Sequence, residues 1–244
     1  MSRIAGNMQD VHARIAAAAA KVSRDPQEIT LLAVSKTFDA IAVMAAIETG
    51  QRDFGENYLQ EALDKIEEVR RLQNSGNGAQ AVLKWHFIGP IQSNKTRPLA
   101  ENFDWVHAID REKIASRLSE QRPAGLPPLD VCIQVNISGE ASKSGVAPAE
   151  LSALAHAIAG MPRLRLRGLM AIPEAAADTA AQRAPFRALR GLYDTLRAEG
   201  LPLDTLSIGM SADLEAAIAE GATIVRIGSA IFGQRTDGSP HATA

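Results

Sequence analysis

One lysine stands where an amine could attack a carbonyl group. Lys36 directly follows the apolar run ITLLAVS, so it is expected at the end of a buried strand. A lysine shielded from water has a lowered pKa, and its neutral amine can then form a Schiff base. The alternative is a solvated charge at the rim of a sheet. Lys95 and Lys143 are weaker candidates because both lie in longer polar loops.

Two short turns near the C-terminus combine glycine with serine, a composition suited to phosphate. SIGMS (207–211) leads into the helical pattern ADLEAAIAE, with Ser211 expected as its N-cap. IGSAIFG (227–233) carries Gly228 and Ser229 and leads into a short extra helix. Free N–H groups at helix N-termini bind phosphate, and glycine allows the backbone to approach it closely. In the simpler interpretation, the glycines only make tight turns and the serine only caps a helix.

Arg226 interrupts the apolar segment TIVRIG, so a guanidinium is expected inside the protein. Burying this group without an acceptor is costly. One interpretation is a structural ion pair with a carboxylate such as Glu56. The other is an acceptor atom on a ligand, for instance a ring nitrogen.

The remaining reactive side chains fit structural roles. His86 and His107 lie within or beside expected strands, and we interpret them as core histidines with satisfied hydrogen bonds. Cys132, the only cysteine, is expected to be an inert packed thiol. No spacing of His, Asp or Glu indicates a metal site, and no Walker, GxSxG or dinucleotide-binding motif occurs.

The elements that must position these residues alternate regularly along the chain. Helical patterns such as 39–49 and 58–69 separate the apolar runs, with Asp39 as an N-cap and Gly50 and Gly200 at C-caps. This α/β pattern predicts a single (β/α)8 TIM barrel, whose active face lies at the C-terminal ends of the strands. Alternation alone does not show closure, so an open doubly wound sheet is the alternative. The expected strands are 29–34, 53–55, 85–88, 105–108, 131–136, 166–171, 205–208 and 223–227.

Composition narrows the class of protein further. We expect residues 1–28 to form an N-terminal helix packed on the barrel, 29–233 to form the barrel, and 234–244 to form a flexible tail. A net charge of −2 without a basic block argues against nucleic acid as a partner. No apolar run approaches a membrane span, and the N-terminus lacks the pattern of a signal peptide. A single cysteine fits a reducing compartment, so a cytoplasmic location is expected.

Six stretches of the chain together carry a family resemblance that runs from about residue 29 to residue 233. In these stretches the sequence resembles the YggS/PROSC family of pyridoxal phosphate homeostasis proteins. The family fold is similar to the barrel domain of alanine racemase, in agreement with the strand count. The stretches are LLAVSKT, DFGENYLQEALDK, WHFIGPIQSNK, IQVNISGEASKSG, LRGLMAI and LSIGMSADLEAAIAEGATIVRIGSAIFG.

The resemblance implies a cofactor, pyridoxal 5'-phosphate (PLP), and a role for each candidate residue. Lys36 would form the Schiff base with PLP, and Arg226 would donate a hydrogen bond to the pyridine nitrogen. Asn57 would lie beside the cofactor. The implied phosphate contacts are Ser207, Ser211, Gly228 and Ser229.

Because arginine stays protonated, it would keep the ring nitrogen unprotonated, and the ring would be a poor electron sink. We therefore expect a monomeric, non-catalytic protein that buffers PLP or delivers it to apoenzymes, with effects on vitamin B6 balance. One alternative is a PLP-dependent amino-acid racemase, although no second base is evident and Tyr58 and Tyr193 are the only tyrosines. Another is a Schiff-base aldolase for a phosphorylated sugar, although the sixth strand, LRGLMAI, contains no lysine.

Overall fold

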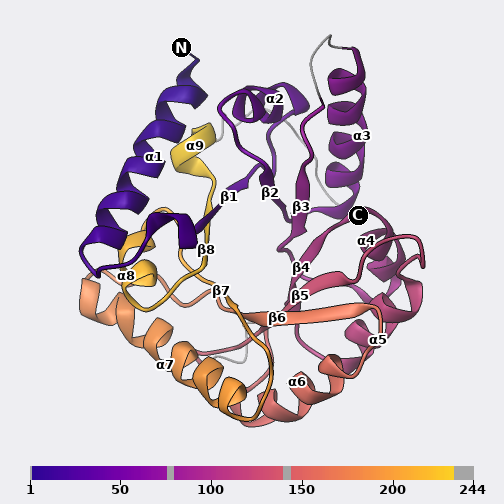
Figure 1. Cartoon of the computed structure of the whole chain (residues 1–244), viewed down its shortest axis with the longest axis vertical. Helices are drawn as coiled ribbons and strands as arrows, with labels where there is room; N and C mark the ends of the chain where they lie inside the picture. The colour runs from indigo at the N-terminus through magenta and orange to yellow at the C-terminus, as the bar shows by residue number, and fades with distance from the viewer. Residues whose placement is uncertain (1, 76–79, 140–143, 234–244) are drawn as a thin grey trace.

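The strands of the protein form a closed barrel. The structure, a computed structural model, describes residues 2–75, 80–139 and 144–233. In these ranges eight parallel strands pair in sequence order, and β1 pairs with β8, where Leu32 stands opposite Arg226 (Figure 1). The predicted (β/α)8 barrel is confirmed and the open sheet is excluded. The strands are β1 (Thr30–Val34), β2 (Asp53–Glu56), β3 (Lys84–Phe87), β4 (Trp105–Ile109), β5 (Leu129–Gln134), β6 (Leu164–Met170), β7 (Thr205–Ser207) and β8 (Ile224–Ile227).

Helices surround the barrel, and local signals explain where they begin and end. Asp39 accepts a hydrogen bond from the backbone N–H of Ala42, which confirms it as the N-cap of α2. Gly50 and Gly200 adopt φ values of 98° and 95° just after α2 and α7, as expected at helix ends. The helices are α1 (Arg3–Ala20), α2 (Ala40–Glu48), α3 (Leu59–Ser75), α4 (Thr96–Asn102), α5 (Glu112–Gln121), α6 (Leu151–Ala159), α7 (Thr179–Ala198), α8 (Leu214–Ala219) and α9 (Ser229–Phe232), with 3-10 turns η1 (Pro26–Glu28), η2 (Ser93–Lys95) and η3 (Pro148–Glu150).

Two strands begin earlier than their apolar patterns predict. β5 begins at Leu129 and β6 at Leu164, although Asp130 and Arg165 break the apolar runs. These two polar residues are partners in the register of β5 with β6, and their side chains form an ion pair. The charges therefore satisfy each other at the beginning of the strands and do not end them.

The expected N-cap at Ser211 is wrong. α8 begins at Leu214 with Asp213 in the N-cap position, and a turn separates Ser211 from the helix. The Asp213 side chain accepts a hydrogen bond from the backbone N–H of Met210 at 2.5 Å, so it closes the turn. A serine before a helical pattern could not reveal that a competing aspartate lies two residues later.

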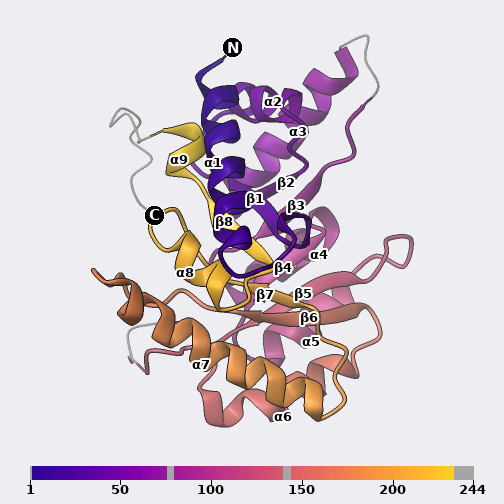
Figure 2. The same cartoon turned by 60° about the vertical axis from the view of Figure 1, so that its left-hand side comes forward.

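The N-terminal helix α1 packs on the outside of the barrel against α2, α8 and α9 (Figure 2). Met8, Val11 and Ile15 form its buried face. On neighbouring positions Asn7 donates to the carbonyl of Ile231 at 2.7 Å, and Arg14 pairs with Glu215 at 2.9 Å. α1 thus supports the two short helices that follow β7 and β8.

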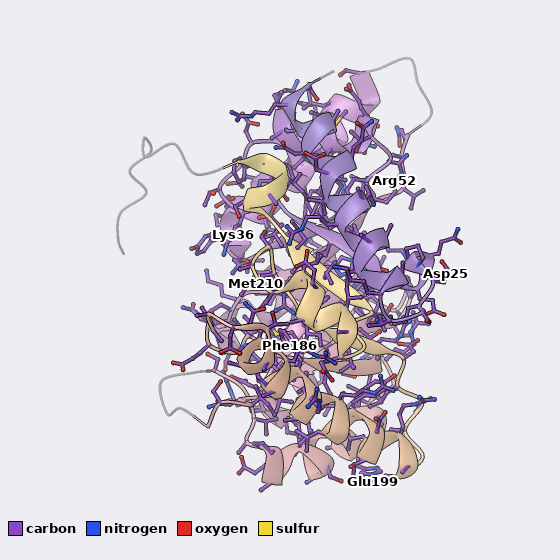
Figure 3. The ribbon with its side chains drawn as sticks, turned by 90° about the vertical axis from the view of Figure 1, so that its left-hand side faces the viewer. Asp25, Lys36, Arg52, Phe186, Glu199 and Met210 are labelled. Atoms are coloured by element: carbon purple, nitrogen blue, oxygen red, sulfur yellow. The ribbon has the colours of Figure 1, made fainter. Side chains whose placement is uncertain are left out.

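The two ends of the barrel carry different residues. Lys36 and Met210, which follow β1 and β7, lie on one side of the molecule (Figure 3). Asp25 and Arg52, which precede β1 and β2, lie on the opposite side. Within the described ranges, no helix has the length and apolar character to cross a membrane.

Candidate functional site

A cavity of about 610 Å³ opens at the C-terminal ends of the strands. Six of the seven residues predicted for the cofactor site line it: Lys36, Asn57, Ser211, Arg226, Gly228 and Ser229. Apolar side chains, among them Val34, Ile88 and Ile172, form much of the remaining wall. The seventh residue, Ser207, is fully buried beneath the cavity in the barrel interior. Ser207 is not among the residues that line this cavity, so the cavity does not support its predicted contact with phosphate.

Lys36 lies two residues after the end of β1 and is half-buried. The next residue, Thr37, has a φ of 68°, an uncommon conformation for a threonine. Phe38 then stacks on Phe232 of α9, with 5.0 Å between the ring centroids. The turn after β1 is therefore fixed on one side by the short helix that follows β8.

A largely buried cluster of charged and polar residues fixes the other side of this turn. We call Ser35, Glu56, Glu61 and Lys65 the anchor cluster. The Lys65 ammonium donates to the carbonyl of Ser35 and to Glu56, both at 2.7 Å, and to Glu61 at 2.9 Å. Glu61 also accepts the backbone N–H of Thr37 at 2.6 Å. The residues before and after Lys36 are thus both held by this cluster.

Glu56 is the innermost member of the anchor cluster and is fully buried. Its Oε1 accepts from the Ser35 hydroxyl at 2.6 Å and from Lys65, whereas its Oε2 is buried without a hydrogen-bond partner in the structure. Burial raises the pKa of Glu56, and the charge of Lys65 opposes that rise. Removing Lys65 would therefore leave a carboxyl group with a strong tendency to take up a proton.

Small residues from the loops after β7 and β8 form the polar end of the cavity. Gly209 has a φ of 93°, and a Cβ there would lie 2.5 Å from the Ala217 side chain. A Cβ at Gly228 would lie 3.1 Å from the carbonyl oxygen of Val34. Gly228 is the N-cap of α9, and its carbonyl accepts the N–H groups of Ile231 and Phe232, which leaves those of Ser229 and Ala230 for an acceptor outside the helix. These loops can therefore bring backbone N–H groups and the Ser211 and Ser229 hydroxyls close to an anion.

Arg226 is directed from β8 across the end of the barrel. It donates through Nη1 to the carbonyl and the hydroxyl of Ser207, and through Nη2 to the carbonyl of Ala171 at 2.9 Å. Burial lowers the pKa of Arg226 to about 10, so it keeps its charge at neutral pH. The ion pair with Glu56 considered from the sequence is wrong, because Glu56 is paired with Lys65.

Asn57 follows β2 and contributes an unused acceptor. Its Oδ1 is buried and has no hydrogen-bond partner in the structure. The backbone of Asn57 lies so close to Gly89 that a Cβ at position 89 would be 2.2 Å from the Asn57 carbonyl oxygen. An orphaned acceptor in a fixed position beside a cavity points to a donor supplied by water or a ligand.

The weaker sequence candidates lie elsewhere. Lys95 is exposed in η2, and Lys143 lies outside the described residues. His86 and His107 are buried and hydrogen-bonded, as expected of core histidines. Cys132 is fully buried, and burial raises the pKa of its thiol, in keeping with an inert packed cysteine. The described part of the chain contains no group of His, Cys, Asp and Glu that could hold a metal ion.

Sequence reasoning missed the anchor cluster. Its one local signal is the spacing of Glu61 and Lys65, which are four residues apart on α3 and form an ion pair. Such a pair is usually a solvated feature of a helix surface. Only the packing of α3 against the turn after β1 shows that Lys65 is buried.

Comparisons with known proteins agree with this architecture. The family described as alanine racemase, N-terminal domain, matches residues 7–236. An alanine racemase from Corynebacterium glutamicum superposes with a TM-score of 0.63 at 20% identity, covering 98% of this chain and 63% of that one. At this identity the likeness shows the fold alone.

Two relatives are much more similar in sequence. The pyridoxal phosphate homeostasis protein of Pseudomonas aeruginosa is 63% identical over 240 residues, which are 98% of this chain and 99% of the relative. The structure of PipY from Synechococcus elongatus with PLP bound has a TM-score of 0.75 at 36% identity, covering 90% of this chain and all of PipY. The chain belongs to the family of pyridoxal phosphate homeostasis proteins.

Proposed function

We propose that this protein binds PLP in the cavity at the C-terminal end of the barrel, as a Schiff base on Lys36. The observation that carries the proposal is the convergence of Lys36, Arg226 and the loops after β7 and β8 on one cavity. A similar protein, PipY, has been solved with PLP bound. The cavity volume of about 610 Å³ is within the range of small-molecule sites.

The residues present fit this cofactor. The orphaned Oδ1 of Asn57 can accept a hydrogen bond from a donor in the cavity. Gly228 provides space where a side chain would press on Val34. Ser211 and Ser229 supply hydroxyl donors to the cavity beside the backbone N–H groups of Ser229 and Ala230, a combination that suits a phosphate.

Each residue then has a distinct task. When bound, PLP supplies an aldehyde carbonyl and an aromatic ring that can act as an electron sink. The Lys36 amine would bond to the carbonyl carbon, whose oxygen would leave as water, and the anchor cluster holds the backbone on both sides of Lys36. Arg226, which keeps its proton, would donate to the ring nitrogen and leave that nitrogen unprotonated.

This arrangement supports a carrier more than a catalyst. Of the described residues that line the cavity, Lys36 is the one able to act as a base near neutral pH. Tyr193 is buried and donates to the carbonyl of Leu203, and Tyr58 is 52% exposed and does not line the cavity. We infer a non-catalytic, monomeric, cytoplasmic protein that buffers PLP and passes it to PLP-requiring apoenzymes.

Titration of the purified protein with PLP, followed by absorption spectroscopy, tests the binding. The expected result is one PLP per chain with a Schiff-base absorption band that Lys36→Ala removes from this site and Lys95→Ala leaves unchanged. Assays across L- and D-amino acids, and of PLP transfer to an apoenzyme, test the carrier role. Rapid turnover that Lys36→Ala abolishes would instead establish a racemase-type enzyme.

A further inference from the structure

A continuous chain of hydrogen bonds crosses the interior of the barrel to the cofactor cavity. Arg226 Nη1 lies 3.0 Å from the Ser207 hydroxyl, which lies 2.8 Å from Nδ1 of His107. Nε2 of His107 lies 3.0 Å from Nδ1 of His86, whose Nε2 lies 3.0 Å from Oδ1 of Asp53. The five residues come from β8, β7, β4, β3 and β2. The chain joins the cofactor end of the barrel to its opposite end.

When both histidines are neutral, the two terminal groups fix the direction of every hydrogen bond between them. A guanidinium only donates, so the Ser207 oxygen accepts from Arg226 and its own proton is available for His107. An ionised carboxylate only accepts, so His86 donates to Asp53 through Nε2. With both histidines neutral, each then carries its proton on Nε2, and every hydrogen bond along the path from Arg226 to Asp53 has one donor and one acceptor.

The surroundings of the histidines agree with this assignment. His107 is fully buried, and burial lowers its pKa well below its usual range, with the positive charge of Arg226 acting in the same direction. If the donors and acceptors of these hydrogen bonds were exchanged, a nitrogen lone pair of His86 would face the carboxylate of Asp53. The Asp53 side chain is 22% exposed and lines a cavity of about 470 Å³ at the N-terminal ends of the strands.

This series of hydrogen bonds determines how Arg226 is presented to a ligand. Its hydrogen bonds to Ser207 and to the Ala171 carbonyl occupy three of the five guanidinium N–H groups. Among the residues that the structure describes, no acceptor takes the other two. The guanidinium is planar and rigid, so holding three of its N–H groups also fixes the direction of the other two. Arg226 is one of the residues that line the cavity.

We propose that Ser207 and His107 are positioning residues, which hold Arg226 so that its free N–H groups meet a ring nitrogen in the cavity. The proposal rests on the proposed function, and it gives Ser207 a role other than contact with phosphate. His86 and Asp53 complete the chain by fixing the tautomer of His107. The cavity therefore favours pyridine ligands whose ring nitrogen is unprotonated and rejects those in which it is alkylated.

The first experiment examines the protein without PLP, so it is independent of cofactor binding. Nitrogen-15 NMR of histidine-labelled apoprotein at neutral pH reports the protonated nitrogen of each ring. We expect His86 and His107 to be neutral with the proton on Nε2. A proton on Nδ1 of His107, or a doubly protonated His107, would overturn the direction of the chain.

The second experiment compares PLP affinity and spectra among variants. Ser207→Ala should raise the Kd for PLP about tenfold and shift the absorption maximum of bound PLP, because Arg226 loses a charge-assisted hydrogen bond. His107→Leu should act in the same direction, whereas His107→Gln should recover most of the affinity, since its amide can both accept from Ser207 and donate to His86.

Thr205→Val is the matched control, because it removes a buried hydroxyl from the same strand without contact to Arg226. It should leave the Kd and the spectrum unchanged. An unchanged Kd and spectrum in Ser207→Ala would refute the positioning role. Failure of the wild type to bind PLP would refute the proposed function instead, while the NMR result would still decide the hydrogen-bond chain.

Discussion

Replacing Lys65 with methionine tests the anchor cluster most sharply. The Lys65 ammonium is 4% exposed and is the cation that faces Glu56, which has no exposure. Methionine keeps most of the side-chain volume, so the main loss is the charge. Removing one partner of a buried ion pair costs about 3–5 kcal/mol, since the other charge is left without compensation.

Protonation of Glu56 sets an upper limit on that cost. A glutamate with an ordinary pKa of roughly 4.3 takes up a proton at neutral pH at a cost of about 3.7 kcal/mol. Lys65→Met should therefore lower the free energy of unfolding by about 3–4 kcal/mol at neutral pH. The loss should shrink by about 1.4 kcal/mol for each unit of decreasing pH, because protonation of Glu56 becomes easier.

Urea denaturation followed by circular dichroism, repeated from neutral to mildly acidic pH, measures this loss. The double variant Lys65→Met/Glu56→Gln should recover about 2 kcal/mol at neutral pH, because no buried charge remains. Lys65→Met should also weaken PLP binding, since the backbone beside Lys36 loses its support. A loss below about 1 kcal/mol that does not vary with pH would refute the assigned role of the cluster.

Three further predictions concern other parts of the structure. Because burial lowers the pKa of His107, the unfolded chain takes up its proton first as pH falls below about 6.5, and stability should decrease by up to about 1.4 kcal/mol per pH unit. His107→Gln should lack this component in urea denaturation, and equal slopes would contradict it. Gly209→Ala should destabilise by about 2 kcal/mol or more, because of its φ of 93° and the close Ala217 side chain. Its control, Gly6→Ala in α1, meets nothing within 4 Å and should stabilise by about 0.5–1 kcal/mol, so similar melting temperatures would count against this reasoning. Arg226→Leu should weaken PLP binding by about tenfold or more, measured by absorption titration, and an unchanged Kd would exclude Arg226 from the site.

The fold was largely predictable because its signals are local. Apolar runs and helical periodicity located all eight strands to within two residues at each end, and Asp39 identified the beginning of α2. The errors occurred where a polar residue has a tertiary partner. Asp130 and Arg165 interrupt their runs, but they neutralise each other across β5 and β6.

The site was predictable at the ends of the strands and not in the barrel interior. Strand order places Lys36 and Arg226 at the same end, so a shared cavity follows from the fold. The partners of Arg226 do not follow in this way. Ser207 and His107 are 100 residues apart, and no local pattern indicates that their side chains meet. The same holds for Glu56 and Lys65, which belong to different elements.

Borohydride reduction of the PLP-loaded protein, followed by tryptic peptide mapping, tests the central claim most directly. Reduction makes the Schiff base permanent, and trypsin does not cleave after a modified lysine. We predict that the label appears on the peptide spanning 25–52, with Lys36 uncleaved inside it. A label on Lys95 or Lys143, or no labelled peptide at all, would contradict the assignment of Lys36.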